Sequence, residues 1–272
     1  MKLIKNISQY LINSNIFVSL CALSLILSSQ LVLKVHDYYI CIFVFFATLF
    51  TYNFQRLIRI KKNVNHPRKE WILNNQISTF LIIIISTIVC GFLFFLFNNN
   101  TKILILLSAS IAILYPFGIR KIPLLKIFII SLIWTVSTMI IVIVENKIIF
   151  DTNTILHVFS RFLFILLITI PFDIRDIKYD TKNIVTIPTL IGSSKSILIS
   201  ILLLVVLENI TIYQFIHYNL SLNFLIAITS FCVFCGFLIM KSNKNQDDFY
   251  FSFWIESLSI FFYLFLTISL LI

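Results

Sequence analysis

The sequence predicts an all-α, polytopic membrane protein, a helical bundle with about nine transmembrane helices. The first observation is composition: 60% of the 272 residues are hydrophobic, and the mean hydropathy is +1.02. The second is that only 12% are charged, about half the usual share for a soluble domain. A soluble enzyme, a disordered chain or a disulfide-stapled secreted domain cannot accommodate so much apolar surface, so these classes are excluded. The third is that the apolar residues form long runs, as a span of about 20 residues requires.

The apolar runs separate into nine expected spans. Runs such as Phe80–Val89 do not alternate between apolar and polar residues, as barrel strands do, so helices are expected. The first run follows Lys2 and Lys5 and looks like a signal peptide, but it has no convincing cleavage site and is long enough to span. The fourth and fifth runs are separated only by the short stretch Gly118–Pro123. The nine expected spans are 10–33, 38–58, 76–97, 103–119, 124–144, 154–172, 194–214, 219–240 and 249–271.

The basic residues divide unevenly between the two sides of these spans. The formal net charge is +10, from 21 Lys and Arg against 11 Asp and Glu. The N-terminus and the loops after spans two, four, six and eight hold 17 of the 21, whereas the opposite loops hold three, Lys34, Lys102 and Lys147. This division predicts a cytoplasmic N-terminus and an external C-terminus. The positive charge therefore indicates topology, and no nucleic-acid partner is expected.

Three of the scarce acids follow the sixth span. Asp173, Asp176 and Asp180 are spaced i, i+3 and i+7, so they share one face if the helix continues past Phe172. Like charges on one face repel, but they are favourable together when they share a hard cation such as Mg2+. The alternative is a solvated helix end, balanced by Arg175 and the lysines near it.

This segment resembles the second aspartate-rich motif of the UbiA superfamily of intramembrane prenyltransferases. The motif reads Asp-x-x-Asp-x-x-x-Asp, followed by a basic residue, a turn with Thr and Pro, and a Gly. Tyr115–Lys121 resembles the family's Tyr/Pro and Lys-Arg loop after span four. Nine spans with a cytoplasmic N-terminus are also the family's layout, so we expect residues 1–272 to form a single domain. The residues that fill the second motif are Asp173, Asp176, Asp180, Lys182, Thr186, Pro188 and Gly192.

The sequence departs from the family at the end of span two. There the family carries a first motif, Asn-x-x-x-Asp-x-x-x-Asp. Asn53 is in place, but Leu57 and Lys61 stand at the two acid positions, and the segment is basic through Arg56, Arg59 and Lys62.

The resemblance implies transfer of a prenyl group from a prenyl diphosphate to a lipophilic acceptor, either an aromatic compound or a lipid. It implies that Asp173, Asp176 and Asp180 hold the cofactor Mg2+ and carry the catalysis. The alternative for the basic residues is ordinary cytoplasmic loop charge, and for the aromatic residues an interfacial belt. The implied diphosphate-binding residues are Asn53, Arg56, Lys61, Arg120, Lys121 and Lys182, and the implied prenyl-cavity residues are Tyr52, Tyr115 and Phe172.

Three functions are compatible with these patterns. The first is an active prenyltransferase, in a multi-pass protein of the bacterial inner membrane. The second is a catalytically degenerate relative that binds a prenyl diphosphate or isoprenoid, or scaffolds a membrane enzyme. The third is a transporter with helices broken at Pro116 and Pro171, which ranks last because the acids lie at the cytoplasmic edge. Ionisable residues within the spans, such as Arg161 and Glu256, are costly there, and a contact between these two is one alternative.

Overall fold

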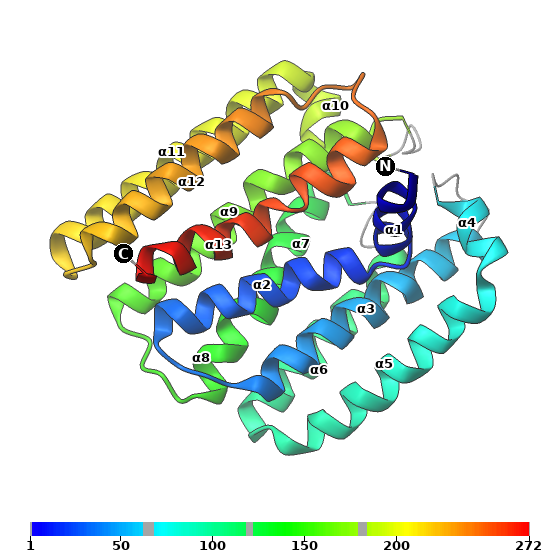
Figure 1. Ribbon diagram of the computed structural model, residues 1–272, viewed down its shortest axis with the longest axis horizontal. Helices are drawn as coiled ribbons and strands as arrows, with labels where there is room; N and C mark the ends of the chain where they lie inside the picture. The colour runs from blue at the N-terminus through cyan, green and yellow to red at the C-terminus, as the bar shows by residue number, and fades with distance from the viewer. Residues whose placement is uncertain (1, 62–67, 118–121, 179–183, 272) are drawn as a thin grey trace.

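The computed structural model describes residues 2–61, 68–117, 122–178 and 184–271, which are helical without any strand (Figure 1). Within these residues, nine helical segments are long and apolar enough to cross a membrane, which confirms the predicted number. The elements are α1 (Lys2–Asn13), α2 (Ile16–Leu33), α3 (Tyr38–Lys61), α4 (Lys69–Asn74), α5 (Gln76–Leu96), α6 (Asn99–Leu114), η1 (Tyr115–Phe117), α7 (Leu125–Thr135), the π-helix η3 (Val136–Ile140), α8 (Ile141–Glu145), α9 (Thr152–Asp176), α10 (Ile187–Ile191), α11 (Ser193–His217), α12 (Leu222–Met240), the π-helix η4 (Tyr250–Ile255) and α13 (Leu258–Leu271).

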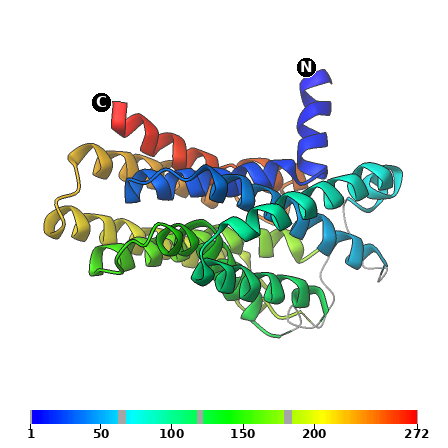
Figure 2. The same cartoon turned by 90° about the horizontal axis from the view of Figure 1, so that it is seen from below.

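The first expected span differs from the structure. The apolar run at 10–33 divides into α1 and α2, and the spanning part is Ile16–Leu33. The break falls at Asn15, whose φ of 66° lies in the left-handed region that asparagine tolerates better than most residues. As a result α1 projects out of the layer of long helices (Figure 2). The other spans agree with the predicted ranges to within a few residues.

The long helices lie roughly side by side. In Figure 1, α11 and α12 pair at one edge, α2 and α13 lie in the middle, and α3 and α5 pair at the other edge; contacts join the helices of each pair. One buried cluster includes Leu25, Phe164 and Phe231, and a second gathers around Ile40 and Val142. The first cluster packs α2 against α9, α11, α12 and α13, and the second packs α2 against α3, α5, α6 and α8, so α2 contributes to both.

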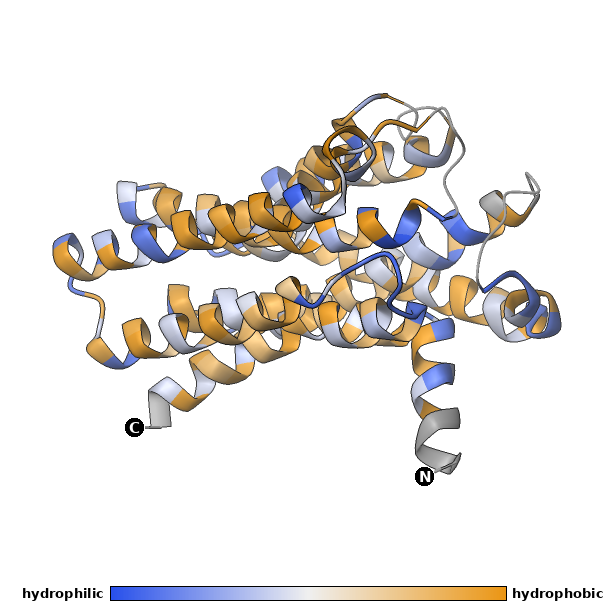
Figure 3. Cartoon of the chain, turned by 90° about the horizontal axis from the view of Figure 1, so that it is seen from above, coloured by the Kyte–Doolittle hydropathy of each residue, from blue (hydrophilic) through white to orange (hydrophobic). Residues whose placement is uncertain are grey.

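Apolar side chains also cover much of the outer surface. Phe95 of α5 is 76% exposed and Val233 of α12 is 72% exposed, an arrangement that suits a hydrocarbon environment and not water. Figure 3 shows apolar residues along the long helices, with many of the hydrophilic residues at helix ends and connections. The Cys232 and Cys235 pair lies in the first buried cluster, and all five cysteines are free.

Helix α9 carries the second aspartate motif. Its N-terminus is capped by Asp151, whose carboxylate accepts a hydrogen bond of 2.8 Å from the Thr154 amide. Pro171 lies inside the helix without ending it, so α9 continues past Phe172 to Asp176. Asp173 and Asp176 are therefore on one helical face, and α9 packs between α7 and α11.

Candidate active site

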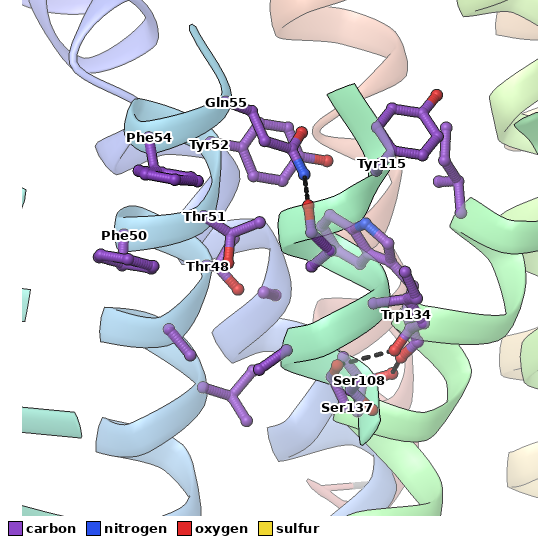
Figure 4. Close-up of a pocket in the computed structure, with 18 of the residues that line it drawn as sticks. Thr48, Phe50, Thr51, Tyr52, Phe54, Gln55, Ser108, Tyr115, Trp134 and Ser137 are labelled. Carbon is purple, nitrogen blue, oxygen red and sulfur yellow. Dashed lines mark hydrogen bonds between the residues drawn. The ribbon is translucent and has the colours of Figure 1, made fainter. Parts of the chain in front are cut away.

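A cavity of about 710 Å3 lies between α3, α5, α6, α7 and α9. Its volume falls within the roughly 300–1,000 Å3 that is usual for ligand pockets. Figure 4 shows one part of it, where Thr48, Thr51 and Tyr52 of α3 face Trp134 of α7. The Tyr52 and Trp134 rings meet edge to face, with centroids 6.4 Å apart.

The greater part of the cavity wall is apolar. Phe43, Phe94 and Ile105 line the part remote from the end of α9, and small residues such as Ala109 leave room between the helices. Gly91 of α5 also lines the wall, and a Cβ atom added there would meet no atom within 4 Å. This part of the cavity is suited to a flexible hydrocarbon chain.

Charged side chains from α7 and α9 meet at the other end of the cavity. The Lys126 ammonium lies 2.6 Å from Asp173 Oδ1 and 3.2 Å from Asp176 Oδ2. The Asp173 side chain is 0% exposed, and that of Lys126 is 7% exposed. The start of α7 is fixed beside the segment after α9, because the Leu124 amide donates a 3.1 Å hydrogen bond to the Val185 carbonyl. Together with the packing of α7 along α9, this hydrogen bond holds Lys126 beside the two aspartates.

The second oxygen of Asp176 binds an arginine. Arg175 donates to Asp176 Oδ1 from both Nε and a terminal nitrogen, at 2.9 and 2.7 Å. The same guanidinium lies 5.1 Å from the centroid of the Phe172 ring, within the distance of a cation–π contact. Each oxygen of Asp176 is thus paired with a different cation.

Arg56 and Arg68 add positive charge to the same cavity. Arg56 donates to the Asn13 carbonyl at 3.0 Å. Arg68 donates to the Ile12 carbonyl at 2.6 Å and to Ser252 Oγ at 2.8 Å. Burial lowers the pKa of Arg68 to about 10, and attraction to Glu256 opposes this. Both guanidinium groups remain charged at neutral pH.

The described ionisable residues of the cavity nearly balance in charge. Four are cationic and three are anionic, which gives a net charge of +1. This end of the cavity therefore presents fixed positive charge beside carboxylates. The cationic residues are Arg56, Arg68, Lys126 and Arg175, and the anionic ones are Asp173, Asp176 and Glu256.

The predicted site residues fall into three groups. Six of them line this cavity: Tyr52, Tyr115, Phe172, Arg56, Asp173 and Asp176. Asn53 does not line it: its amide donates to the Ser14 and Leu49 carbonyls and accepts from Asn15, so it joins α3 to the turn between α1 and α2. The third group lies outside the described residues and consists of Arg120, Lys121, Asp180, Lys182 and the side chain of Lys61.

The sequence profile of the UbiA prenyltransferase family matches residues 68–266. The chain belongs to the UbiA prenyltransferase family. The match begins after α3, so the altered first motif around Asn53, Leu57 and Lys61 lies outside it. No curated protein sequence matches the chain.

Solved structures share the fold of this UbiA family member. A UbiA homologue from Archaeoglobus fulgidus bound to GPP and Mg2+ has a TM-score of 0.67 at 12% identity, covering 97% of this chain and 100% of the homologue. A digeranylgeranylglyceryl phosphate synthase structure has a TM-score of 0.62 at 16% identity, with 98% and 100% covered. An apo UbiA homologue from Aeropyrum pernix K1 has a TM-score of 0.60 at 13% identity, with 97% of each chain covered. At these identities the likeness establishes the fold.

The Asp173 and Asp176 pair is suited to a cation. Their oxygens converge on one position, which the Lys126 ammonium takes here. Mg2+ commonly binds through one or two carboxylates and completes its shell with water and substrate phosphate. Within the described part of the chain, no group of three or more His, Cys, Asp or Glu side chains is placed to hold a metal. The Asp173 and Asp176 carboxylates therefore fit a shared magnesium ion, and Asp180 lies outside the described residues.

Sequence reasoning did not assign four of the cavity's charged residues to the site. In the sequence, Lys126 and Arg68 belong to the 17 basic residues on the predicted cytoplasmic side, Arg175 balances the acids of its helix end, and Glu256 is a costly residue inside a span. Lys126 carried a usable signal, because it follows Pro123 and stands at the start of an apolar run. The contact weighed between Glu256 and Arg161 is not what the structure shows: Glu256 lines this cavity, whereas Arg161 binds two serines of α2.

Proposed function

We propose that this UbiA family member is a prenyltransferase that moves a prenyl group from a prenyl diphosphate to a lipophilic acceptor within the membrane. The observation that carries the proposal is a cavity of about 710 Å3 that is apolar along most of its length and ends in a compact group of charged residues. Such a cavity matches an amphiphile with a hydrocarbon tail and a multiply charged head. The family membership, and the fold shared with a homologue bound to GPP and Mg2+, support the proposal.

The charged end would bind the diphosphate. Arg56 and Arg68 present fixed cations to it, and Arg175 adds a third, held in place by Asp176 and Phe172. Hydrogen bonds between guanidinium and phosphate are stronger than neutral ones and position the head group. Lys61, Arg120, Lys121 and Lys182 remain proposed members of this group, whereas the Asn53 amide is engaged outside the cavity, with Ser14, Leu49 and Asn15.

The reaction breaks the bond between the prenyl carbon and the diphosphate oxygen. Pyrophosphate leaves with the bonding electrons, and the cationic side chains stabilise its charge. The allylic cation left behind is protected from water by the apolar wall, where the Tyr52 ring can stabilise it, while the Phe172 ring contacts Arg175. The acceptor then forms a bond to the prenyl carbon and loses a proton.

We further propose that Asp173 and Asp176 hold Mg2+, with Asp180 as the third carboxylate of the motif. When bound, Mg2+ would supply positive charge to the diphosphate and assist its departure. The Lys126 ammonium, which pairs with both aspartates here, then becomes available to the diphosphate. The distribution of basic residues favours a site that faces the cytoplasm, and we propose a bacterial inner membrane as its location.

The test is transfer of a labelled prenyl group by purified protein. Wild type with Mg2+ is expected to convert labelled geranyl or longer prenyl diphosphates into a product that retains the label and extracts with lipids. Asp176→Ala should lose most of this activity while remaining folded. If wild type and Asp176→Ala show no turnover and no binding over several donors and acceptors, the proposal is overturned.

A second function is favoured by one observation. Lys126 fills the cation position between the aspartates, and the first motif carries Leu57 and Lys61 in place of acids. A member with built-in cations and fewer metal ligands can bind prenyl diphosphate without turning it over. Saturable binding of prenyl diphosphate, with no product from any acceptor, would distinguish this function from catalysis.

A further inference from the structure

A second polar site lies around Arg161, farther towards the N-terminal end of α9. Arg161 precedes Asp173 by twelve residues, so it lies about 18 Å away along the helix, at 1.5 Å per residue. It lines a small cavity of about 40 Å3 that shares no lining residue with the large one. This cavity is therefore separate from the proposed active site.

Arg161 is buried and only partly paired. Its residue exposure is 5%. One terminal nitrogen donates to Ser28 Oγ at 2.7 Å and Ser29 Oγ at 3.0 Å, and the guanidinium lies 5.4 Å from the centroid of the Phe262 ring. The other terminal nitrogen is buried without a hydrogen-bond partner.

These contacts leave the charge of Arg161 uncompensated. Its contacts in the described chain are two hydroxyl groups and a ring, and no carboxylate there lies within 4 Å of it. An arginine does not give up its proton in proteins. Burying an isolated charge is costly unless an opposite charge accompanies it, and the cost is greatest inside a membrane. An anion is therefore expected to accompany the Arg161 guanidinium.

The small cavity offers further donors to such a partner. Ser160 also lines it, and its hydroxyl is buried without a partner. The His157 ring forms another part of the wall. The Gln214 amide and Thr211 hydroxyl are already used, since they donate to Asn153 and to the Leu207 carbonyl. The available donors are therefore the guanidinium, the Ser160 hydroxyl and the imidazole.

We propose that this cavity binds a small monovalent anion, of the size of chloride, between Arg161 and Ser160. The volume of about 40 Å3 exceeds the roughly 10–15 Å3 needed to admit one water, but it is far below that of a pocket for a phospholipid head or a prenyl chain. Water alone could fill the space but would bring no counter-charge. A halide supplies the missing charge and accepts several hydrogen bonds at once.

The anion would stabilise the contact between α2, α9 and η3. Ser29 of α2 accepts from Arg161 of α9 and donates to the Thr138 carbonyl of η3 at 2.6 Å. Thr138 in turn lines the large cavity. The anion site therefore sits where α2, α9 and the π-helix meet, and its occupancy should stabilise the folded bundle.

The test measures chloride binding directly and does not depend on catalysis. Purified protein in detergent is titrated with sodium chloride, sodium bromide or sodium gluconate at constant ionic strength. The readouts are the 35Cl NMR line width and the thermal unfolding midpoint. The variants are Arg161→Gln, which removes the charge, and Ser160→Ala, which keeps it. Lys147→Asn is the control, because Lys147 is an exposed cation in a turn outside the cavity, and its left-handed φ of 53° suits asparagine.

We expect wild type and Lys147→Asn to broaden the chloride line in a way that bromide competes away. Their unfolding midpoint should rise with chloride and bromide but not with gluconate. Arg161→Gln should lose both effects, and Ser160→Ala should weaken chloride binding several-fold. Equal line widths and equal midpoints in all three salts for wild type would overturn the proposal, and would mean that water fills the cavity. A chloride effect that survives unchanged in Arg161→Gln would also overturn it.

Discussion

Replacing Lys126 by methionine removes the cation between Asp173 and Asp176 while keeping a side chain of similar length. The Asp173 side chain is 0% exposed and loses its 2.6 Å partner. Asp176 is 15% exposed and keeps Arg175, so it is affected less. Removing one partner of a buried pair costs about 3–5 kcal/mol, and we take the lower end because Asp176 keeps its pair with Arg175. At about 2–4 °C per kcal/mol for a chain of this size, the unfolding midpoint should fall by roughly 6–12 °C.

The assay is thermal unfolding in detergent, followed by tryptophan fluorescence, with and without Mg2+. Lys195→Met is the matched control, because Lys195 is exposed at the start of α11, and its midpoint should stay close to that of wild type. Adding Asp173→Asn to Lys126→Met should recover much of the loss, since both charges of the pair are then gone. Mg2+ should stabilise Lys126→Met more than wild type, because it no longer competes with an ammonium. A ligand at 100 times its Kd adds about 2.7 kcal/mol.

Two results would refute this reasoning. One is a Lys126→Met unfolding midpoint equal to that of Lys195→Met, which would mean that the buried pair contributes nothing to stability. The other is a Mg2+ effect of the same size in wild type and in Lys126→Met, which would mean that the ion binds somewhere other than between the aspartates.

Three further predictions concern the cavity and helix α9. Gly91→Leu should prefer shorter prenyl diphosphate donors than Gly91→Ala does, because the added side chain enters open space in the cavity wall. Mass spectrometry of the product chain lengths checks this, and equal lengths for both variants would contradict it. Phe172→Leu should raise the KM for the donor several-fold with a smaller effect on kcat, because the Arg175 guanidinium, which is proposed to bind the diphosphate, loses the ring 5.1 Å away. An unchanged KM would count against a role for Arg175 in binding. The hydrogen bond from Thr154 holds the pKa of the Asp151 carboxyl below its ordinary value of 3.8, so its stabilisation is present above that value and is lost as the pH falls through the lower folded-state pKa. Unfolding midpoints between pH 5 and 3, measured for wild type and Asp151→Asn, should therefore converge as the pH falls, and parallel curves would contradict this.

Composition and the length of the apolar runs were sufficient to predict eight of the nine spans to within a few residues. A helix in lipid must satisfy its own backbone, so long apolar runs such as Gln76–Leu96 are readable without any tertiary information. The break at Asn15 was not predicted, because it depends on one residue in the left-handed conformation within a run that stays apolar on average. The sequence predicts the continuation of α9 through Pro171 only as a condition, because the packing of α9 against α7 and α11 is not readable from the sequence.

The candidate site was only partly predictable for a related reason. Asp173 and Asp176 could be recognised because their spacing is local to one helix. Lys126 and Arg68 reach the same cavity from other elements, and their sequence positions look like ordinary loop charge. Their proximity to the aspartates is a property of how the helices pack. Asn53 shows the converse, because its place in a motif did not reveal that its amide joins α3 to the turn after α1.

The most direct test of the proposed site is competition binding with three ligands: geranyl diphosphate, geraniol and inorganic pyrophosphate. Geranyl diphosphate should bind far more tightly than either of the others, because the apolar cavity and the charged end act on the same molecule. Arg56→Gln combined with Arg68→Gln should weaken the binding of both phosphate-bearing ligands and leave geraniol unchanged. If geraniol binds as tightly as its diphosphate, or if the double variant affects all three ligands equally, the cavity is not a prenyl diphosphate site.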